Sequence, residues 1–126
     1  MEPLLRKVDA VLVRVPSIDE GLSFYRDRLG QRLRWRTETM AAVALGDSEL
    51  VLSTELNPEV DLLVDSVPAA VRVMREAGST VVMDPKPIDV GLVAVVNDPF
   101  GNSITLVDLS NGPYEVDDAG YAVRKK

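Results

Sequence analysis

The residue types that carry most enzyme chemistry are missing from this chain. Its 126 residues contain no His and no Cys. That absence excludes a Ser-His-Asp triad, thiolate nucleophiles, disulfides, iron–sulfur clusters and every metal site built on histidine or cysteine. No Gly-rich phosphate loop of the Walker type is present, so nothing supports nucleotide hydrolysis. The side chains left for chemistry or for binding a charged group are carboxylates, arginines and hydroxyls.

Two of the carboxylates, Glu59 and Asp61, alternate with Val60 and Leu62 along an expected strand. Both therefore project from the face opposite to those apolar side chains. In a partly apolar hollow a carboxylate has a raised pKa, and it could then act as a general base or bind a cationic ligand. A solvated strand start is the simpler interpretation, and no second catalytic group with a matched role can be named.

A second charged pattern consists of Arg32, Arg34 and Arg36, which alternate along another expected strand. The alternation predicts that all three share one face of the strand. They would either clamp an anion or form a solvated face with surface ion pairs, and the second interpretation is the simpler one. Trp35 is then expected on the opposite face, as a packed core or dimer-interface residue rather than a stacking platform.

An internal repeat positions these residues. Residues 11–30 and 60–78 each contain an apolar run, a Ser, an amphipathic helical pattern and a final Gly. The two halves also end alike, with GDSELVLS at 46–53 and GNSITLVDLS at 101–110, so Gly46 pairs with Gly101. The second half has about six extra residues, which we expect at Pro85-Lys86-Pro87.

Each half is predicted to be a βαβββ module. In the first half, alternating valines at 11, 13 and 15 predict a strand, and the capping box Ser17-Ile18-Asp19-Glu20 begins a helix that ends at Gly30. The other elements are expected as strands near 31–37, 40–45, 49–53, 60–64, 80–83, 92–97 and 104–108, with a second helix near 67–77. Residues 111–126 are expected to form a polar tail, partly ordered by Tyr114 and Tyr121.

This organisation resembles the vicinal-oxygen-chelate superfamily, also called the glyoxalase/bleomycin-resistance/dioxygenase superfamily. The resemblance covers residues 8–110 and rests on the repeat, on Phe24-Tyr25…Leu29-Gly30 and on Asp98-Pro99-Phe100-Gly101-Asn102. It implies an α+β fold of two tandem βαβββ modules that form a curved mixed sheet around a cavity. Residues 1–126 are then a single domain, with module one at about 8–54, module two at about 59–110 and the tail at 111–126.

Structural roles are expected for these motifs themselves. Phe24, Tyr25 and Leu29 are expected in the core, and the DPFGN segment is expected to connect two strands. The function that the resemblance implies is broad, because the same fold serves isomerases, epimerases, dioxygenases, thiol transferases and drug-binding proteins.

Metal-dependent members of that superfamily take four ligands from the first, fourth, fifth and eighth strands. The resemblance places those positions on Ala10, Leu50, Glu59 and Thr105. Ala and Leu offer no donor atom, a Thr hydroxyl is a poor ligand, and one carboxylate does not hold Zn²⁺, Ni²⁺, Mn²⁺ or Fe²⁺. We therefore expect no bound metal and no cofactor.

Strand alternation predicts which side chains occupy the sheet face turned away from the helices. A partly apolar, partly acidic set is typical of a small-molecule site. The set expected on this cavity face is Ala10, Leu12, Arg14, Leu50, Glu59, Asp61, Leu63, Thr105 and Val107.

The charge of the chain restricts the classes of molecule that it is expected to bind. The net charge is −6, and the acidic residues dominate between residues 8 and 123. Such a body repels nucleic acid and anionic membranes, so the ligand is expected to be neutral or cationic with an apolar body. No signal peptide or apolar run of membrane length is visible, and a cytoplasmic protein is expected. The half-covered sheets and the resemblance imply a homodimer.

Three functional hypotheses follow. The first is a metal-free small-molecule-binding protein that resembles the bleomycin-resistance branch and sequesters a drug or metabolite. The second is a glyoxalase-like or dioxygenase-like enzyme, a lyase or isomerase, that uses carboxylate acid–base chemistry. The third is an interaction module with a collapsed cavity. Turnover of a 2-oxoaldehyde hemithioacetal separates the second from the first, and a roomy pocket separates both from the third.

Overall fold

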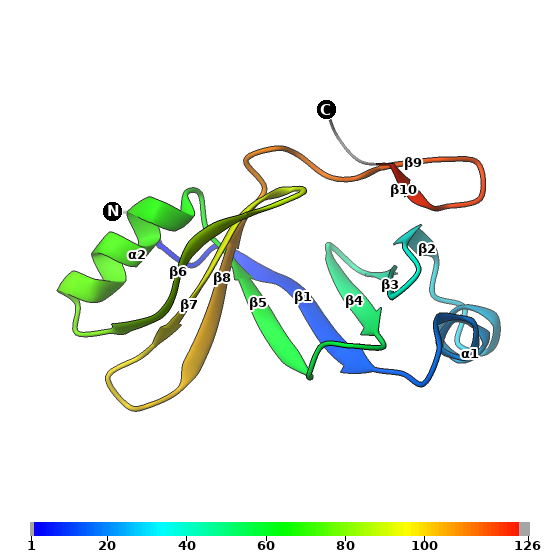
Figure 1. Cartoon of the computed structure of the whole chain (residues 1–126), viewed down its shortest axis with the longest axis horizontal. Helices are drawn as coiled ribbons and strands as arrows, with labels where there is room; N and C mark the ends of the chain where they lie inside the picture. Colours follow the sequence, from blue (N-terminus) through cyan, green and yellow to red (C-terminus); the bar gives the residue numbers. More distant parts are fainter. Residues whose placement is uncertain (1, 124–126) are drawn as a thin grey trace. The chain divides into compact units, whose positions relative to one another are not determined.

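The computed structural model describes residues 2–123 and divides them into two compact units (Figure 1). The first-repeat unit contains Ala10–Glu59 together with the residues from Tyr114 onward. The second-repeat unit contains the residues up to Asp9 together with Val60–Pro113. In the described part of the chain each unit has a four-stranded sheet with one helical segment against it.

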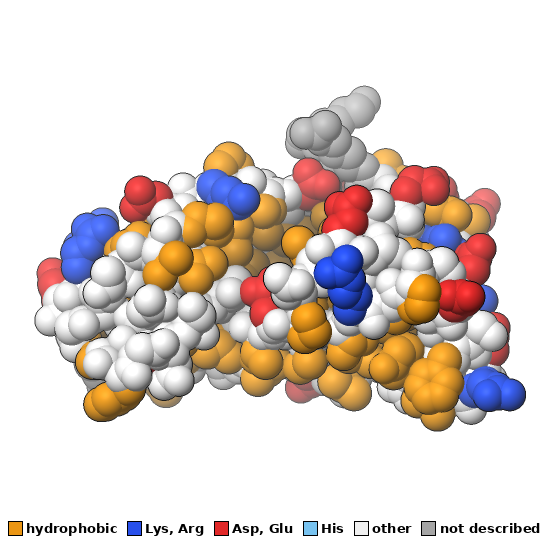
Figure 2. Space-filling model, turned by 60° about the horizontal axis from the view of Figure 1, so that its bottom comes forward, with side chains coloured by type: hydrophobic (Ala, Val, Ile, Leu, Met, Phe, Trp, Pro, Cys, Tyr) orange, Lys and Arg blue, Asp and Glu red, His pale blue; other side chains and the backbone are white. Residues whose placement is uncertain are grey.

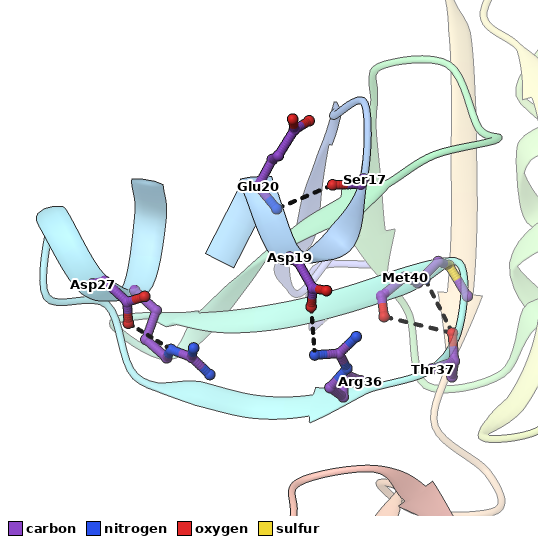
Figure 3. A network of polar contacts seen from close by, with 8 residues as sticks. Ser17, Asp19, Glu20, Asp27, Arg36, Thr37 and Met40 are labelled. Atoms are coloured by element: carbon purple, nitrogen blue, oxygen red, sulfur yellow. Dashed lines mark hydrogen bonds and ion pairs between the residues drawn. The ribbon is translucent and has the colours of Figure 1, made fainter. Parts of the chain in front are cut away.

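The first-repeat unit follows the predicted βαβββ order. Its elements are β1 (Lys7–Arg14, which starts in the other unit), α1 (Ile18–Leu22), the π-helical segment η1 (Ser23–Arg28), β2 (Leu33–Arg36), β3 (Met40–Leu45) and β4 (Ser48–Ser53). The sheet order is β2-β3-β4-β1, with β1 and β4 parallel and the other neighbours antiparallel. Ser17 caps the helix as predicted, because its hydroxyl accepts a hydrogen bond of 3.1 Å from the Glu20 amide (Figure 3).

The second-repeat unit repeats this order. Its elements are β5 (Glu59–Leu63), α2 (Val67–Glu76), β6 (Thr80–Ile88), β7 (Gly91–Asn97) and β8 (Ser103–Asp108), in the sheet order β5-β8-β7-β6. Ser66 caps α2 by accepting from the Ala69 amide, and Pro68 stands in the first turn, where its missing N–H leaves no bond unmade. Helix α2 packs on β6, β7 and β8 (Figure 1), with Val67, Val96 and Leu106 fully buried between them.

This architecture confirms the predicted α+β fold of two βαβββ modules with mixed strand directions. The extra residues expected at Pro85-Lys86-Pro87 lie within a strand that is longer than the predicted 80–83. β6 continues through Pro85 and Pro87 and reaches Ile88. This is possible because β6 is the edge strand of its sheet order and its register with β7 is irregular, and prolines within sheets occur at such edges and bulges.

The end of the first helix differs from the expectation. Phe24 is 47% exposed and Leu29 is 54% exposed. The prediction that both lie in the core is therefore wrong. The wide π-helical turn at Ser23–Arg28 shifts the positions that follow away from the 3.6-residue spacing on which the prediction relied. Of these three residues, Tyr25 alone packs against the core between the sheet and α1. The Phe24 ring meets the Tyr25 ring edge to face, with the two ring centroids 5.0 Å apart.

The DPFGN segment is a tight connection between β7 and β8, as predicted. The Asp98 carboxylate accepts hydrogen bonds from the Phe100 amide, the Asn102 amide and the Asn102 side chain, at 2.8, 2.9 and 2.8 Å. The bonds from Asn102 are the main reason that the pKa of Asp98 lies below its ordinary value. Gly101 takes a φ of +93°, which favours glycine.

The tail is ordered over its described residues. It forms a hairpin of β9 (Glu115–Val116) and β10 (Ala122–Val123) that belongs to the first-repeat unit. The predicted anchors both make contacts, because Tyr114 packs on Trp35 and Tyr121 lies under the guanidinium of Arg36. The remainder of the predicted tail, 124–126, lies outside the described residues.

Candidate binding site on the open face of the first-repeat unit

The two faces of the first-repeat sheet carry separate apolar clusters. The face toward α1 has a cluster that contains Val15, Ile18, Leu22, Ala41, Val43 and Leu52. The opposite face, which we call the open face, has a second cluster of Ala10, Leu12, Ala42 and Val51, with Trp35 and Met40 packed against it. We call this second cluster, including Trp35 and Met40, the apolar patch. It is the candidate site developed below.

Ala10 and Leu12, expected on the face turned away from the helices, pack in this patch, where they are 3% and 5% exposed. Arg14 follows two residues later at the end of β1, is exposed, and pairs in register with Ser53. The alternation of β1 is therefore as predicted, with Val13 and Val15 packed toward the helix and Ala10 and Leu12 away from it.

Leu50 requires a correction, because it packs with the helix-facing cluster and not on the open face. Register explains the error. β1 and β4 pair Leu12 with Val51, whereas β5 and β8 pair the equivalent Asp61 with Thr105, so Val51 and not Leu50 matches Thr105. The hairpins that precede β4 and β8 differ in length, and pairing their glycines therefore displaced the strand by one residue.

In the second-repeat unit the remaining predicted residues occupy one face of the β5–β8 pair. Asp61 lies opposite Thr105, and Leu63 lies opposite Val107, which is 3% exposed. Their neighbours Val64 and Leu106 pack on the other face, in the cluster under α2. Glu59 begins β5 and is partly exposed.

Glu49 is a residue of the open face that the sequence reasoning missed. Its register partner on β1 is Ala10, which places its side chain beside the apolar patch. One carboxylate oxygen lies 3.4 Å from the indole nitrogen of Trp35 and the other lies 3.6 Å from the Arg34 guanidinium, and the side chain is 24% exposed. The alternation of Glu49, Val51 and Ser53 with two leucines was the signal that could have identified it.

The arginine pattern of β2 also requires a correction. The register between β2 and β3 shifts between Leu33 and Trp35, as at a β-bulge, so the three arginines do not share a face. Arg34 reaches Glu49 on the open face, whereas Arg36 turns toward α1 and lies 3.4 Å from the Asp19 carboxylate (Figure 3). Trp35 consequently stands on the same side as Arg34 and not opposite to it.

These residues do not fit the metal site of the fold family. At the corresponding positions of the first and fourth strands, Ala10 and Val51 offer only hydrocarbon. Within residues 2–123 no group of three or more His, Cys, Asp or Glu side chains is placed to hold a metal ion. The donor set therefore cannot build the tetrahedral or octahedral sites that transition metals require.

One carboxyl group near the strand start has a shifted pKa. Burial raises the pKa of Asp9, and the charge of Lys7 partly opposes that effect. Asp9 precedes Ala10 on β1, so its side chain projects from the face opposite to the apolar patch. It is therefore not a base for a ligand bound at the patch.

Comparison with known proteins identifies the class to which this fold belongs. Residues 7–106 match the model of the Glyoxalase/Bleomycin resistance protein/Dioxygenase superfamily. The chain belongs to this superfamily. A search of curated proteins finds no match.

Solved structures share the fold at low sequence identity. A hypothetical protein from Bacillus halodurans is 20% identical over 89% of this chain and 98% of its own, with a TM-score of 0.69. Methylmalonyl-CoA epimerase from Mycobacterium tuberculosis is 18% identical over 86% of this chain and 91% of its own, with a TM-score of 0.69. A Streptomyces coelicolor methylmalonyl-CoA epimerase in complex with 2-nitronate-propionyl-CoA is 20% identical, covers 82% and 97%, and has a TM-score of 0.66.

The described residues were also compared with the requirements of a membrane span. None of their helices combines the length and the apolar character needed to cross a bilayer.

Proposed function

We propose that this protein binds a small molecule with an apolar body at the apolar patch, without a metal ion. The patch itself supports the proposal most directly. It combines a floor of short aliphatic side chains with the indole of Trp35 and the thioether of Met40, and a single carboxylate, Glu49, stands at its border. Apolar surfaces with a few placed polar groups are the usual composition of ligand sites.

The charge around the patch supports a neutral or cationic ligand. Residues 10–59 contain eight acidic residues and six arginines, and the Glu49 carboxylate, which also pairs with Arg34, lies 3.4 Å from the indole nitrogen of Trp35. On the face that Figure 2 shows, acidic and basic side chains are interspersed with hydrophobic ones. A moderate excess of negative charge attracts cations over a distance that salt shortens, and it disfavours anions.

Ligand-dependent melting shifts test this proposal. A panel of aromatic ammonium compounds, neutral aromatics and aromatic carboxylates of similar size should raise Tm for the first two groups and not for the third, because binding to the native state stabilises it. The shift for the ammonium compounds should shrink at high salt, whereas the shift for the neutral compounds should not. Tighter binding of the carboxylates would contradict the proposed ligand charge.

An enzymatic function is the second candidate, and Glu49 is the observation that favours it. A partly buried carboxylate beside an apolar patch is placed to move a proton on a bound substrate. The assays to run are isomerisation of a 2-oxoaldehyde hemithioacetal and, in view of the epimerases that share the fold, epimerisation of methylmalonyl-CoA. Turnover that is lost in Glu49→Gln and kept in Glu59→Gln would establish this function in place of simple binding.

Metal content provides a separate prediction. Protein purified without chelator and dialysed should hold far less than one Zn, Ni, Mn or Fe per chain, because the family's ligand positions lack donors. Elemental analysis measures this directly. Near-stoichiometric metal that survives dialysis would contradict a metal-free site.

We also propose that the chain is a homodimer. The physical reason is that in the second-repeat unit α2 packs on one face of the sheet, and the other face gains burial from a partner. Sedimentation equilibrium at micromolar concentration should give about twice the chain mass of 13.8 kDa. A species of one chain mass under those conditions would refute the dimer.

The cytoplasmic location stays a prediction.

A further inference from the structure

The segment beyond the family-matched core returns to the first-repeat unit. The family model ends at residue 106, whereas the β9–β10 hairpin lies next to β2, where Arg36 and Tyr121 form a β-bridge (Figure 1). The hairpin maintains its own shape, because the Asp117 carboxylate accepts hydrogen bonds of 2.9 Å from the amides of Ala119 and Tyr121. Residues 114–123 are therefore an ordered addition to the superfamily core.

Three contacts fasten this hairpin to β2. The ring centroids of Tyr114 and Trp35 are 4.7 Å apart, and the Arg36 guanidinium carbon lies 4.8 Å from the centre of the Tyr121 ring. The Arg36 amide also donates a hydrogen bond of 2.8 Å to the carbonyl oxygen of Gly120. Aromatic pairs, cation–π contacts and single hydrogen bonds are each weak in net terms, so each of these contacts can break by itself.

Trp35 connects the hairpin to the candidate site. The same side chain that receives Tyr114 packs against the floor of the apolar patch. The four floor residues are 6% exposed or less, so a ligand reaches them only if a covering side chain moves. Trp35 is one of the covering side chains, and its movement breaks or rearranges the contact with Tyr114.

We propose that residues 114–123 form a lid that holds the apolar patch closed through the contact of Tyr114 with Trp35. This inference rests on the proposed function of the patch. In the closed arrangement Tyr114 keeps Trp35 against the floor. In the open arrangement Tyr114 leaves, and the flat aromatic or aliphatic body of a ligand takes its place on the indole. The apparent affinity is then lower than the intrinsic affinity by the fraction of molecules that are open.

The test measures binding of the neutral dye N-phenylnaphthylamine by its own fluorescence. Tyr114→Ala should bind the dye roughly three- to tenfold more tightly than the wild type, which is the factor expected from the loss of one aromatic pair. Tyr114→Phe should bind the dye more weakly than Tyr114→Ala, since it keeps the ring on the indole. Phe100→Ala is the matched control, because Phe100 is 87% exposed in the other unit and its loss should change nothing.

A second readout needs no ligand. Trp35 is the single tryptophan of the chain, so acrylamide quenching of its fluorescence reports its accessibility. Quenching should rise in Tyr114→Ala and not in Phe100→Ala. Unchanged quenching together with unchanged or weaker dye binding in Tyr114→Ala would overturn the lid. Increased quenching with no dye binding in any variant would uphold the lid and refute the proposed function.

Discussion

Replacing Asp108 by alanine should destabilise the protein by about 2–4 kcal/mol, because it leaves several buried donors without an acceptor. Asp108 is 2% exposed at the end of β8. Its carboxylate accepts hydrogen bonds from the Val67 amide at 2.8 Å, the Leu92 amide at 2.9 Å and the Ser110 hydroxyl at 2.8 Å. It therefore ties the first turn of α2 to β7 and to the residues that follow β8.

The stabilisation by Asp108 should depend on pH. Burial acts to raise the pKa of Asp108, but the hydrogen bonds from Val67, Ser110 and Leu92 outweigh it, and the pKa lies below its ordinary value of 3.8. A depressed carboxyl pKa contributes stability that is present above the unfolded-state pKa and is lost as the pH falls through the folded-state value. The difference in stability between wild type and Asp108→Asn should thus be constant from neutral pH to about 4 and shrink below it.

Urea unfolding at a series of pH values measures both effects. Asp65→Ala is the matched control, because Asp65 is also acidic and lies at the start of the same helix, but its side chain is 78% exposed and forms a surface ion pair with Arg6. Its loss should cost less than about 1 kcal/mol. A cost for Asp108→Ala no greater than for Asp65→Ala would contradict the capping role.

Removal of the Trp35 ring should weaken binding of an apolar ligand by about tenfold or more, which corresponds to the burial of a large apolar side chain. The comparison is best made in the Tyr114→Ala background, so that the lid is absent from both proteins. Trp35→Ala then removes only the aromatic wall of the patch. Dye titration measures the change, and Phe24→Ala, which truncates an exposed aromatic of the same unit, is the control.

Equal dye affinity in Tyr114→Ala and in the double variant would place the ligand away from Trp35. Loss of affinity in Phe24→Ala as large as in Trp35→Ala would point to the helix side of the unit instead. Melting curves of each variant separate a loss of the site from a loss of folding.

Much of the fold could be predicted from the sequence because its signals are local and repeated. Ser17 and Ser66 cap the two helices, and the alternation of β1 correctly assigns Ala10 and Leu12 to the open face. The repeat supplied the order of strands, since each half had to bury the same pattern against its own helix.

The errors arose where backbone geometry departs from a regular period. The π-helical turn exposes Phe24, and the register shift in β2 separates Arg34 from Arg36. Because the hairpins before β4 and β8 differ in length, the alignment of the two halves assigned Leu50 to the open face and missed Glu49. In the structure Leu50 packs toward the helix and Glu49 lies on the open face. A bulge or a π turn shifts every later side chain, and its cause lies in tertiary contacts that periodicity does not contain.

The tail contacts could be anticipated only in part. Tyr114 and Tyr121 indicated order in a polar segment, but nothing in the local sequence identified Trp35 and Arg36 as their partners. Those contacts join residues that are far apart along the chain, and a hairpin of two short strands carries no periodic signal of where it packs.

The most direct test of the central claim is a titration of chelator-treated, metal-free protein with N-phenylnaphthylamine, followed by energy transfer from Trp35. Trp35 is the single tryptophan and packs against the apolar patch, so its quenching reports dye bound to the folded chain, and the loss of dye affinity in Trp35→Ala places that dye at the patch. The account predicts saturable binding of one dye per chain with quenching of Trp35. Absence of saturable binding, or binding that requires added Zn²⁺ or Ni²⁺, would contradict it.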